Sequence, residues 1–230
     1  SIRNHLIHIF DIYKFDFIEG IAYSKTNIII ITGKLTDDSS NCSNLPGDGV
    51  YYKLLKTNSI TKLSIYDYLW RWDTDMFWGT DNFSILQNKI FRKITQRTIL
   101  NSVILRYANM ILFNNNLPNI EFITQDVGIP INRVWTFFNW LDQNIGNYPI
   151  WLCPVKTKKT PTYLCKLNDG QIYCDFGIFT SKKYSDSESH KYNRVIEKKM
   201  LELNGMKCFY SNNYFTSNEF DEIVDYEKYK

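Results

Sequence analysis

The chain has 230 residues, of which 44% are hydrophobic and 22% charged, as is typical of a globular protein with a buried core. Its formal net charge of +3 is too small to indicate a nucleic-acid-binding protein, for which a clustered basic surface is expected. No apolar run approaches the roughly 18 residues of a membrane-spanning helix, so no membrane span is expected in this chain.

The first half of the chain is predicted to begin with two strands. Aromatic and β-branched residues dominate 16–35 on both sides of a short polar connection at 24–27. The composition of 36–49 is typical of a loop, and 64–70 is predicted as another strand. The stretch from 83 to 106 contains neither proline nor glycine, and its apolar spacing predicts one or two helices.

The second half shows a regular order of elements. We predict a strand at 120–130, a helix at 131–145, strands at 148–155 and 171–179, a helix at 185–205, a short strand that leads into a loop within 206–214, and an acidic helix at 217–229. Gly146 is placed as the C-terminal cap of the first helix and Asp186 as the N-cap of the second.

Strand, helix, strand, strand, helix, strand is the ferredoxin-like order. It forms an antiparallel sheet with two helices on one face and leaves the other face without helices. The fold class is therefore predicted as α+β, with a ferredoxin-like β-α-β-β-α-β core at about 120–210 and an N-terminal extension of strands and helices. We accordingly divide the chain into an N-terminal part, 1–118, and a core part, 119–230.

The common catalytic motifs are absent from the sequence, which contains no GxGxxG, GxxxxGK[ST], HExxH or GxSxG. His5, His8 and His190 have no recognisable partners for a triad or a metal site. The five cysteines are odd in number, show no CxxC spacing and follow no secretion signal, which indicates thiols of a cytoplasmic protein and no zinc site. The residues alone therefore predict a fold without assigning its chemistry.

Five segments, in chain order, resemble one family, the FAD-linked Δ24-sterol reductases of the Diminuto-like group. They are FIEGIAYSKTNIIIITGKLTDD (17–38), YLWRWDTDMFW (68–78), TQDVGIP (124–130), YPIWLCP (148–154) and FYSNNYFTSNEFDEIVD (209–225). More distantly, the same parts are similar to the substrate half of the wider vanillyl-alcohol-oxidase-like flavoproteins.

The resemblance implies that this chain is the C-terminal substrate or cap portion of such an enzyme, inactive alone, with FAD held mainly by a separate FAD-binding domain. It implies reduction of a C=C bond in the side chain of a sterol-like lipid, with NADPH as reductant, and a location at the surface of the endoplasmic reticulum for the full-length protein. Two alternatives stay open. One is a flavin oxidase or dehydrogenase of the same architecture that acts on an alcohol or sugar-lipid; the other is a degenerate, flavin-free domain that binds a lipid or a partner.

The resemblance also implies roles for individual residues. It places Tyr210 as the catalytic proton donor, Gln125, Asn213 and Arg71 at the cofactor, and Trp151, Cys153 and Trp78 at the substrate. Because side chains alternate along a strand, Trp151 and Cys153 share one face. They line a pocket if that face carries no helices, and they belong to the core if it does.

Other readings of these residues stay open. Gln125 is as well explained as a turn amide that is satisfied within the fold. Arg71 is also explained by an ion pair with Asp73.

Overall fold

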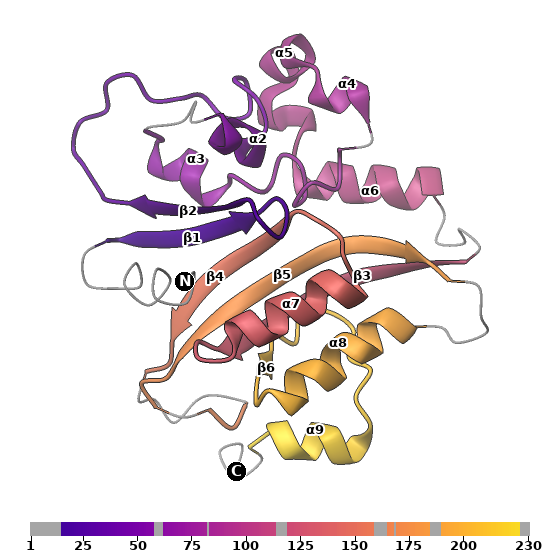
Figure 1. The fold of residues 1–230 in the computed structure, drawn as a ribbon. Helices are drawn as coiled ribbons and strands as arrows, with labels where there is room; N and C mark the ends of the chain where they lie inside the picture. The colour runs from indigo at the N-terminus through magenta and orange to yellow at the C-terminus, as the bar shows by residue number, and fades with distance from the viewer. Residues whose placement is uncertain are drawn as a thin grey trace. The chain divides into compact units, whose positions relative to one another are not determined.

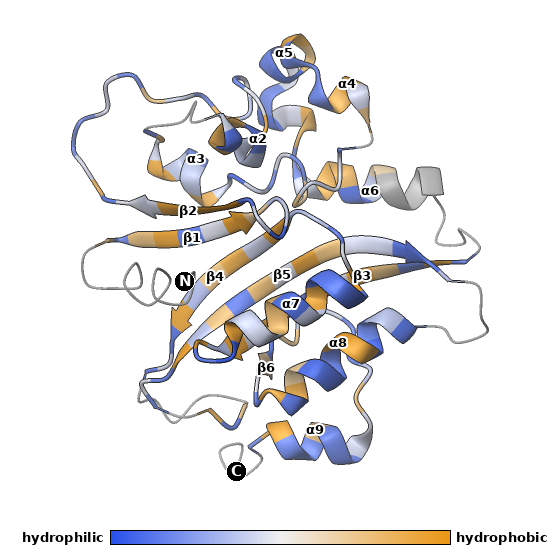
Figure 2. Cartoon of the chain, in the orientation of Figure 1, coloured by the Kyte–Doolittle hydropathy of each residue, from blue (hydrophilic) through white to orange (hydrophobic). Residues whose placement is uncertain are grey.

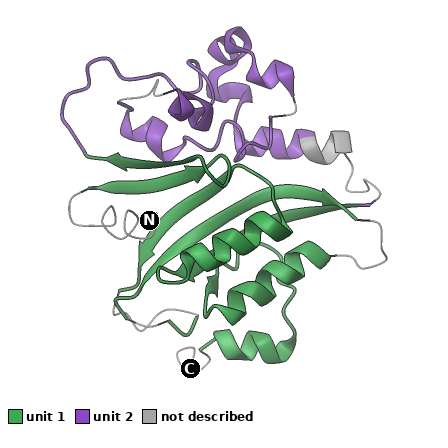
Figure 3. Ribbon diagram, in the orientation of Figure 1, with its two compact units in different colours: residues 1–34, 120–230 green, residues 35–119 purple. Residues whose placement is uncertain are grey.

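A computed structural model, drawn in Figure 1, describes residues 15–57, 62–81, 83–113, 119–158, 165–167, 169–184 and 190–225. The chain divides into two compact units (Figure 3). Unit 1 comprises 1–34 and 120–230, and unit 2 comprises 35–119. Unit 1 thus includes the two N-terminal strands, which the sequence assigned to the N-terminal part; the division at 118–119 stays a prediction.

Unit 1 is built on one six-stranded sheet in the order β2-β1-β4-β5-β3-β6 (Figure 1). Its strands are β1 (Phe17–Ala22), β2 (Ile28–Gly33), β3 (Ile120–Pro130), β4 (Ile150–Lys156), β5 (Ile172–Lys183) and β6 (Met206–Lys207). All neighbouring strands are antiparallel. The helices of unit 1 are α7 (Val134–Asn144), α8 (Lys191–Glu202) and α9 (Ser217–Ile223).

The order β3-α7-β4-β5-α8-β6 confirms the predicted α+β fold and its ferredoxin-like succession of elements. β1 and β2 extend this core, because β1 pairs with β4, the outermost strand of the ferredoxin-like part, and β2 then forms the edge of the whole sheet. The β1–β2 hairpin turns where the sequence predicts it: the Ser24 hydroxyl oxygen accepts the backbone N–H of Asn27 at 3.0 Å. A short polar connection is thereby sufficient to reverse the chain.

Helices α7 and α8 lie across the same face of the sheet, and the main hydrophobic core fills the space between them and the strands (Figure 1). The helices contribute Phe137, Phe138, Leu141, Ile196 and Met200, and the strands contribute Ile123, Val127, Ile150, Leu152, Phe176 and Ile178. The rings of Phe137 and Phe176 meet edge to face with centroids 4.9 Å apart. Hydrophobic and hydrophilic residues are mixed along both helices in Figure 2, as expected for helices with one buried face.

The C-terminus of α7 and the N-terminus of α8 are stabilised by different hydrogen bonds. Gly146 adopts a φ of +64° and its N–H donates to the Leu141 carbonyl at 2.9 Å, which confirms the predicted C-terminal cap of α7. The predicted N-cap of α8, Asp186, lies outside the described residues. At the start of α8, the Glu121 carboxylate of β3 accepts the backbone N–H groups of Tyr192 and Asn193 at 3.1 and 2.7 Å. A side chain from the sheet therefore satisfies the helix terminus.

Unit 2 is helical in its described part. It contains α2 (Tyr51–Lys56), α3 (Ile65–Leu69), α4 (Ser84–Gln87), α5 (Lys89–Ile99) and α6 (Ser102–Phe113). The helical state predicted over 83–106 is confirmed, but the segment forms three helices, α4, α5 and the start of α6, rather than one or two. Among the described residues, no helix combines the length and apolarity that crossing a membrane requires.

The strand predicted at 64–70 is wrong, because this segment forms α3. The Ser64 hydroxyl accepts the backbone N–H of Asp67 at 3.0 Å, which is an N-cap contact, and the Asp67 carboxylate accepts the Ser64 hydroxyl. Asp67 also pairs with Arg97 of α5 at 2.8 Å. Capping and this ion pair outweigh the strand preference of the aromatic and β-branched residues.

Candidate functional site

The face of the sheet opposite α7 and α8, here called the second face, carries the side chains that alternate with the core. Ile150 and Leu152 of β4 pack in the core beneath the helices. Since successive side chains of a strand point to opposite faces, Trp151 and Cys153 lie on the second face. This confirms the predicted direction of the YPIWLCP strand, away from the two helices.

Trp151 is held by a buried carboxylate from the neighbouring strand. Its indole Nε1–H donates to the Glu19 carboxylate of β1 at 2.9 Å. Glu19 is only 2% exposed, so this hydrogen bond satisfies a group that is removed from water. Glu19 was not singled out in the sequence; a carboxylate inside the apolar run FIEGIA is the signal that could have revealed it.

A second contact joins Tyr210 to Asp126. The Tyr210 hydroxyl donates to the Asp126 Oδ2 atom at 2.6 Å. Asp126 is 8% exposed; burial raises its pKa, and the hydrogen bond from Tyr210 partly opposes that rise. The Tyr210 residue is 59% exposed, yet burial of its hydroxyl end, followed by the contact with Asp126, raises the pKa of the phenol. Tyr210 thus links a buried carboxyl group to the protein surface.

Asp175 of β5 is a third carboxylate on the second face, which the sequence analysis missed. It is 6% exposed, and burial together with the charge of Asp126 raises its pKa to about 8. A charged residue between Cys174 and Phe176, both core residues, is the sequence signal for it. An Asp in such a position either has a buried partner or holds a proton.

Glycines face both aspartates across the β3–β5 pair. Asp126 stands opposite Gly177, and Asp175 stands opposite Gly128. The absence of a Cβ at Gly177 makes room for Asp126 and Trp151, because a Cβ there would lie 3.0 Å from Asp126 Oδ1 and 3.1 Å from the Trp151 ring. No side chain from the facing position therefore separates the acidic groups from the indole.

Two cysteines, Cys153 and Cys208, are neighbours of Asp175 and Asp126 in the sheet. Cys153 is directly opposite Asp175 across β4–β5, and the Cys208 backbone N–H donates to the Asp126 carbonyl at 3.0 Å. Burial, and then the charges of Asp175 and Asp126, raise the pKa of Cys208 to about 12. All five cysteines are thiols, as predicted. Within the described ranges, no group of three or more His, Cys, Asp or Glu residues is arranged to hold a metal ion.

Two residues predicted at the cofactor lie elsewhere in unit 1. Gln125 is fully buried on the helix-covered face, where its amide donates to Asn193 of α8 at 2.8 Å. Asn213 is exposed in the loop after β6. The structure therefore does not bring either residue into the cluster of Asp126, Asp175 and Trp151, and their role at a cofactor stays a prediction.

Arg71 and Trp78 belong to unit 2. The Arg71 guanidinium lies 4.1 Å from the centroid of the Tyr68 ring and donates to the Tyr68 carbonyl at 2.7 Å. Trp78 is 8% exposed and packs edge to face on Trp72 with ring centroids 5.9 Å apart. Asp73, considered as an ion partner of Arg71, accepts the Ser102 backbone N–H at 3.0 Å. The role of Trp78 at the substrate also stays a prediction.

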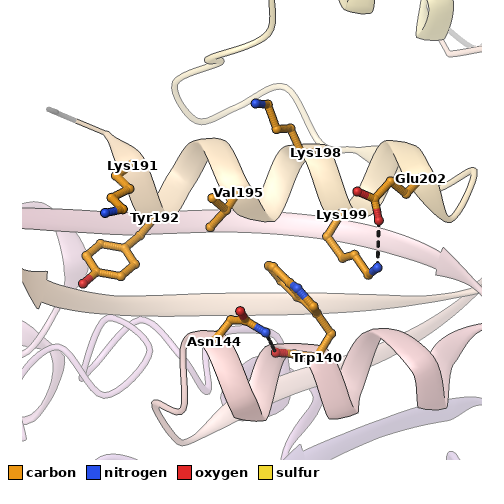
Figure 4. A pocket seen from close by; sticks show the side chains of 8 residues that line it. All are labelled: Trp140, Asn144, Lys191, Tyr192, Val195, Lys198, Lys199 and Glu202. Carbon is orange, nitrogen blue, oxygen red and sulfur yellow. Dashed lines mark hydrogen bonds and ion pairs between the residues drawn. The ribbon is translucent and has the colours of Figure 1, made fainter.

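A pocket of about 390 Å³ lies along α7 and α8, on the helix side of the sheet (Figure 4). Its lining residues are Trp140, Asn144, Lys191, Tyr192, Val195, Lys198, Lys199 and Glu202. Lys199 is paired with Glu202 at 2.7 Å. The sequence singled out none of these residues, and none of the second-face acidic groups lines this pocket.

The second face has the chemistry to meet the flat ring of a flavin, the cofactor that the sequence resemblance implies. Asp126 and Asp175 each keep one buried carboxyl oxygen without a hydrogen-bond partner, and Trp151 presents a flat aromatic surface beside them. An N–H group of such a ring could donate a hydrogen bond to an oxygen of this kind. The pyrophosphate of FAD is different, because it requires a glycine-rich loop at a helix N-terminus, and the sequence has no such motif.

Comparison with known proteins gives consistent relatives. The human and mouse Delta(24)-sterol reductases are each 27% identical to the chain over 222 residues, which is 91% of this chain. The Caenorhabditis elegans Delta(24)-sterol reductase homolog dhcr-24 is 23% identical over 225 residues. The chain spans 43% of the length of each of these relatives. No family model matches the chain, and no solved structure matches it significantly.

These relatives confirm the resemblance that the five sequence segments predict. Over 91% of its length, the chain is homologous to a C-terminal part of the Delta(24)-sterol reductases.

Proposed function

We propose that the chain is the substrate or cap portion of an FAD-dependent oxidoreductase that reduces a C=C bond of a sterol-like lipid, with NADPH as the reductant. The observation that carries the proposal is the hydrogen bond of 2.6 Å between Tyr210 and Asp126 on the second face, in a chain similar to sterol reductases. A separate FAD-binding domain is the partner in this proposal, and the surface of the endoplasmic reticulum is the expected location of the full-length protein.

The chain's own residues have distinct tasks in this reaction. Reduced FAD, when bound, supplies a hydride to the substrate. Tyr210 holds a proton on its hydroxyl oxygen and delivers it to the other alkene carbon, while Asp126 orients that hydroxyl. Trp151, held by Glu19, provides a rigid apolar wall for a flat lipid. The proposal gives Gln125 no role in the proton transfer, since its side chain lies on the helix side.

The test measures conversion of a Δ24 sterol by the complete encoded protein, expressed in cells without their own Δ24-sterol reductase and assayed with NADPH. We expect the wild-type protein to reduce the sterol, and Tyr210→Phe to lower the rate about 100-fold or more, because a positioned acid contributes at least that factor. Tyr66→Phe is the control, since Tyr66 is an exposed tyrosine of unit 2. A wild-type protein that is expressed and folded but leaves the sterol unchanged would overturn the proposal.

The same preparations separate the alternatives. Oxidation of an alcohol or sugar-lipid without sterol reduction would favour the oxidase or dehydrogenase. Sterol binding by a preparation that contains no flavin would favour the lipid-binding domain. For the isolated chain we expect no stable yellow complex with FAD, because the sequence has no glycine-rich loop for the pyrophosphate. Tight FAD binding by this chain alone would contradict the division of tasks between two domains.

A further inference from the structure

Asp126 and Asp175 form a pair on the second face. They lie on the adjacent strands β3 and β5, two residues apart in register, because Asp126 faces Gly177 and Gly128 faces Asp175. Diagonal neighbours on one face of an antiparallel pair are within about 7–8 Å of each other. The residue opposite each aspartate is a glycine without a Cβ, and the charge of Asp126 contributes to the raised pKa of Asp175.

Two negative charges are unfavourable at this place. Both residues are less than one-tenth exposed, at 8% and 6%, and each has an Oδ1 atom without a hydrogen-bond partner. In the part of the chain that the structure describes, neither carboxylate forms an ion pair. Tyr210 and Cys208 interact electrostatically with both carboxyl groups and Cys174 interacts with Asp175, and none of these three groups carries a positive charge in any protonation state.

We infer that Asp126 and Asp175 together hold one proton at neutral pH and that this proton is passed to Tyr210, so that the second face carries its own proton store. The presence of the store follows from burial, register and unpartnered oxygens. Its use in protonating a substrate carbon rests on the proposed function. Asp126 and Asp175 act through Tyr210 and are therefore positioning residues rather than catalytic ones.

The proton transfer balances without any further reagent except water. As a C–H bond forms at the alkene carbon, the Tyr210 O–H bond breaks and leaves a phenolate. At rest the shared proton lies on Asp126 Oδ1 or on Asp175, because Asp126 Oδ2 accepts the Tyr210 hydroxyl. It moves to Asp126 Oδ2, from Asp175 by way of a water molecule, and the phenolate takes it from there across the 2.6 Å contact. The acid pair, now fully ionised, is recharged by a proton from water. The electron pair for the other alkene carbon is the hydride that the proposed cofactor supplies.

The presence of the store is tested on the purified 230-residue chain, without substrate or flavin, by infrared spectroscopy of protonated carboxyl groups across a pH titration. Because burial raises the pKa of Asp75 to about 7, its carboxyl group would contribute a band of its own, so every protein in this titration also carries Asp75→Asn. In that background we expect a protonated carboxyl band that persists at neutral pH when Asp126 and Asp175 are both present. Asp175→Asn should remove it or move its midpoint to lower pH, because the remaining carboxyl group loses its charged neighbour. Asp126→Asn should lower the midpoint for the same reason, and Tyr210→Phe should raise it, since the hydrogen bond that favours the ionised form is lost.

Asp142→Asn is the matched control. Asp142 also accepts a tyrosine hydroxyl, that of Tyr148 at 2.8 Å, but its hydrogen bond with Lys25 holds the pKa of that carboxyl below its usual range. This variant should leave the band unchanged. Circular dichroism establishes that each variant is folded. A folded Asp75→Asn protein with no protonated carboxyl band at neutral pH, or a band that neither Asp126→Asn nor Asp175→Asn alters, overturns the inference.

The use of the store is tested on the complete encoded protein. The rate of sterol reduction should fall as pH rises past the midpoint of the band. Asp175→Asn should move this alkaline decrease in rate to lower pH. A simple loss of packing does not produce such a shift of the pH profile. Sterol reduction with a pH profile unaffected by Asp175→Asn would reject the proton supply and leave the proposed reductase standing. If the band behaves as expected but the protein does not reduce the sterol, the proposed reductase is rejected and the proton store of Asp126 and Asp175 is kept.

Discussion

The hydroxyl of Tyr210 donates a hydrogen bond of 2.6 Å to Asp126, a residue 84 positions earlier in the chain. β6 creates this contact by pairing with β3, where Val127 meets Lys207 and Gly128 meets Met206. The backbone N–H of Cys208 then donates to the Asp126 carbonyl at 3.0 Å and sets the loop that carries Tyr210. A strand of two residues therefore determines where the candidate proton donor stands.

Tyr210→Phe should destabilise the folded chain by about 1–3 kcal/mol at alkaline pH, because the buried Asp126 carboxylate loses its donor. The loss should be smaller at acidic pH, where Asp126 is neutral. Urea unfolding at both pH values measures it. Tyr148→Phe is the matched control and should cost less, since Asp142 keeps its contact with Lys25 at 2.8 Å. Equal losses from the two variants would show that Asp126 is solvated.

Gly177→Ala should disturb the second face. The new Cβ would lie 2.9 Å from the Phe179 ring, 3.0 Å from Asp126 Oδ1 and 3.1 Å from the Trp151 ring, so these groups must move. We expect a loss of about 1–3 kcal/mol, typical of overpacking, and a change in tryptophan fluorescence. Gly33→Ala in β2 is the control, because its Cβ would make ordinary contacts of 3.5 Å with Phe17. A Gly177→Ala variant as stable as Gly33→Ala contradicts the described packing.

The buried ion pair of Lys207 and Glu197 should be costly to break. The two side chains are 0% exposed and their Nζ and Oε1 atoms are 2.6 Å apart. Lys207→Met leaves Glu197 charged in the interior and should cost about 3–5 kcal/mol in urea unfolding. The double variant Lys207→Met/Glu197→Leu should cost less than the sum of the single changes. The more exposed pair of Lys199 and Glu202 provides the comparison, because Lys199→Met should cost less than about 1 kcal/mol.

Asp75 in unit 2 should make stability depend on pH. Burial raises its pKa to about 7, above the value near 4 of an unfolded aspartate. The folded state thus binds the proton more tightly, and the free energy of unfolding falls as pH rises from about 4 to about 7, by at most about 1.4 kcal/mol per pH unit for this group. Asp75→Asn removes this contribution and keeps an acceptor for the Trp78 backbone N–H, which lies 3.1 Å from the carboxylate.

The measurement is urea unfolding at a series of pH values for the wild type and Asp75→Asn. A slope remains in the variant, because Asp126 and Asp175 in unit 1 also have raised pKa values. Asp37→Asn, which changes an exposed carboxylate elsewhere in unit 2, is the control and should retain the wild-type slope. Identical slopes in the wild type and Asp75→Asn would show that Asp75 is ionised in the folded protein throughout this range.

Local patterns in the sequence were enough for most of the elements. The apolar spacing that predicts α7 and the alternation that predicts β4 involve only neighbouring residues, and both elements form where expected. The prediction of a strand at 64–70 was wrong because the contact between Ser64 and Asp67 stabilises a helical turn, which outweighs the strand preference of the other residues. The resemblance to sterol reductases then added the expectation that Trp151 and Cys153 face away from the helices.

The sequence by itself determined the order of strands and helices in the second half of the chain and the side on which alternating residues of one strand fall, because both depend on spacing along the chain. Only the tertiary structure decided which residues meet across strands. It brought Asp175, which the sequence analysis did not single out, beside Asp126 through the β3–β5 register, and it turned Gln125 toward α8. The pairing partner of each strand depends on long-range packing and burial, and the proximity that makes a buried carboxyl group hold a proton arises only there.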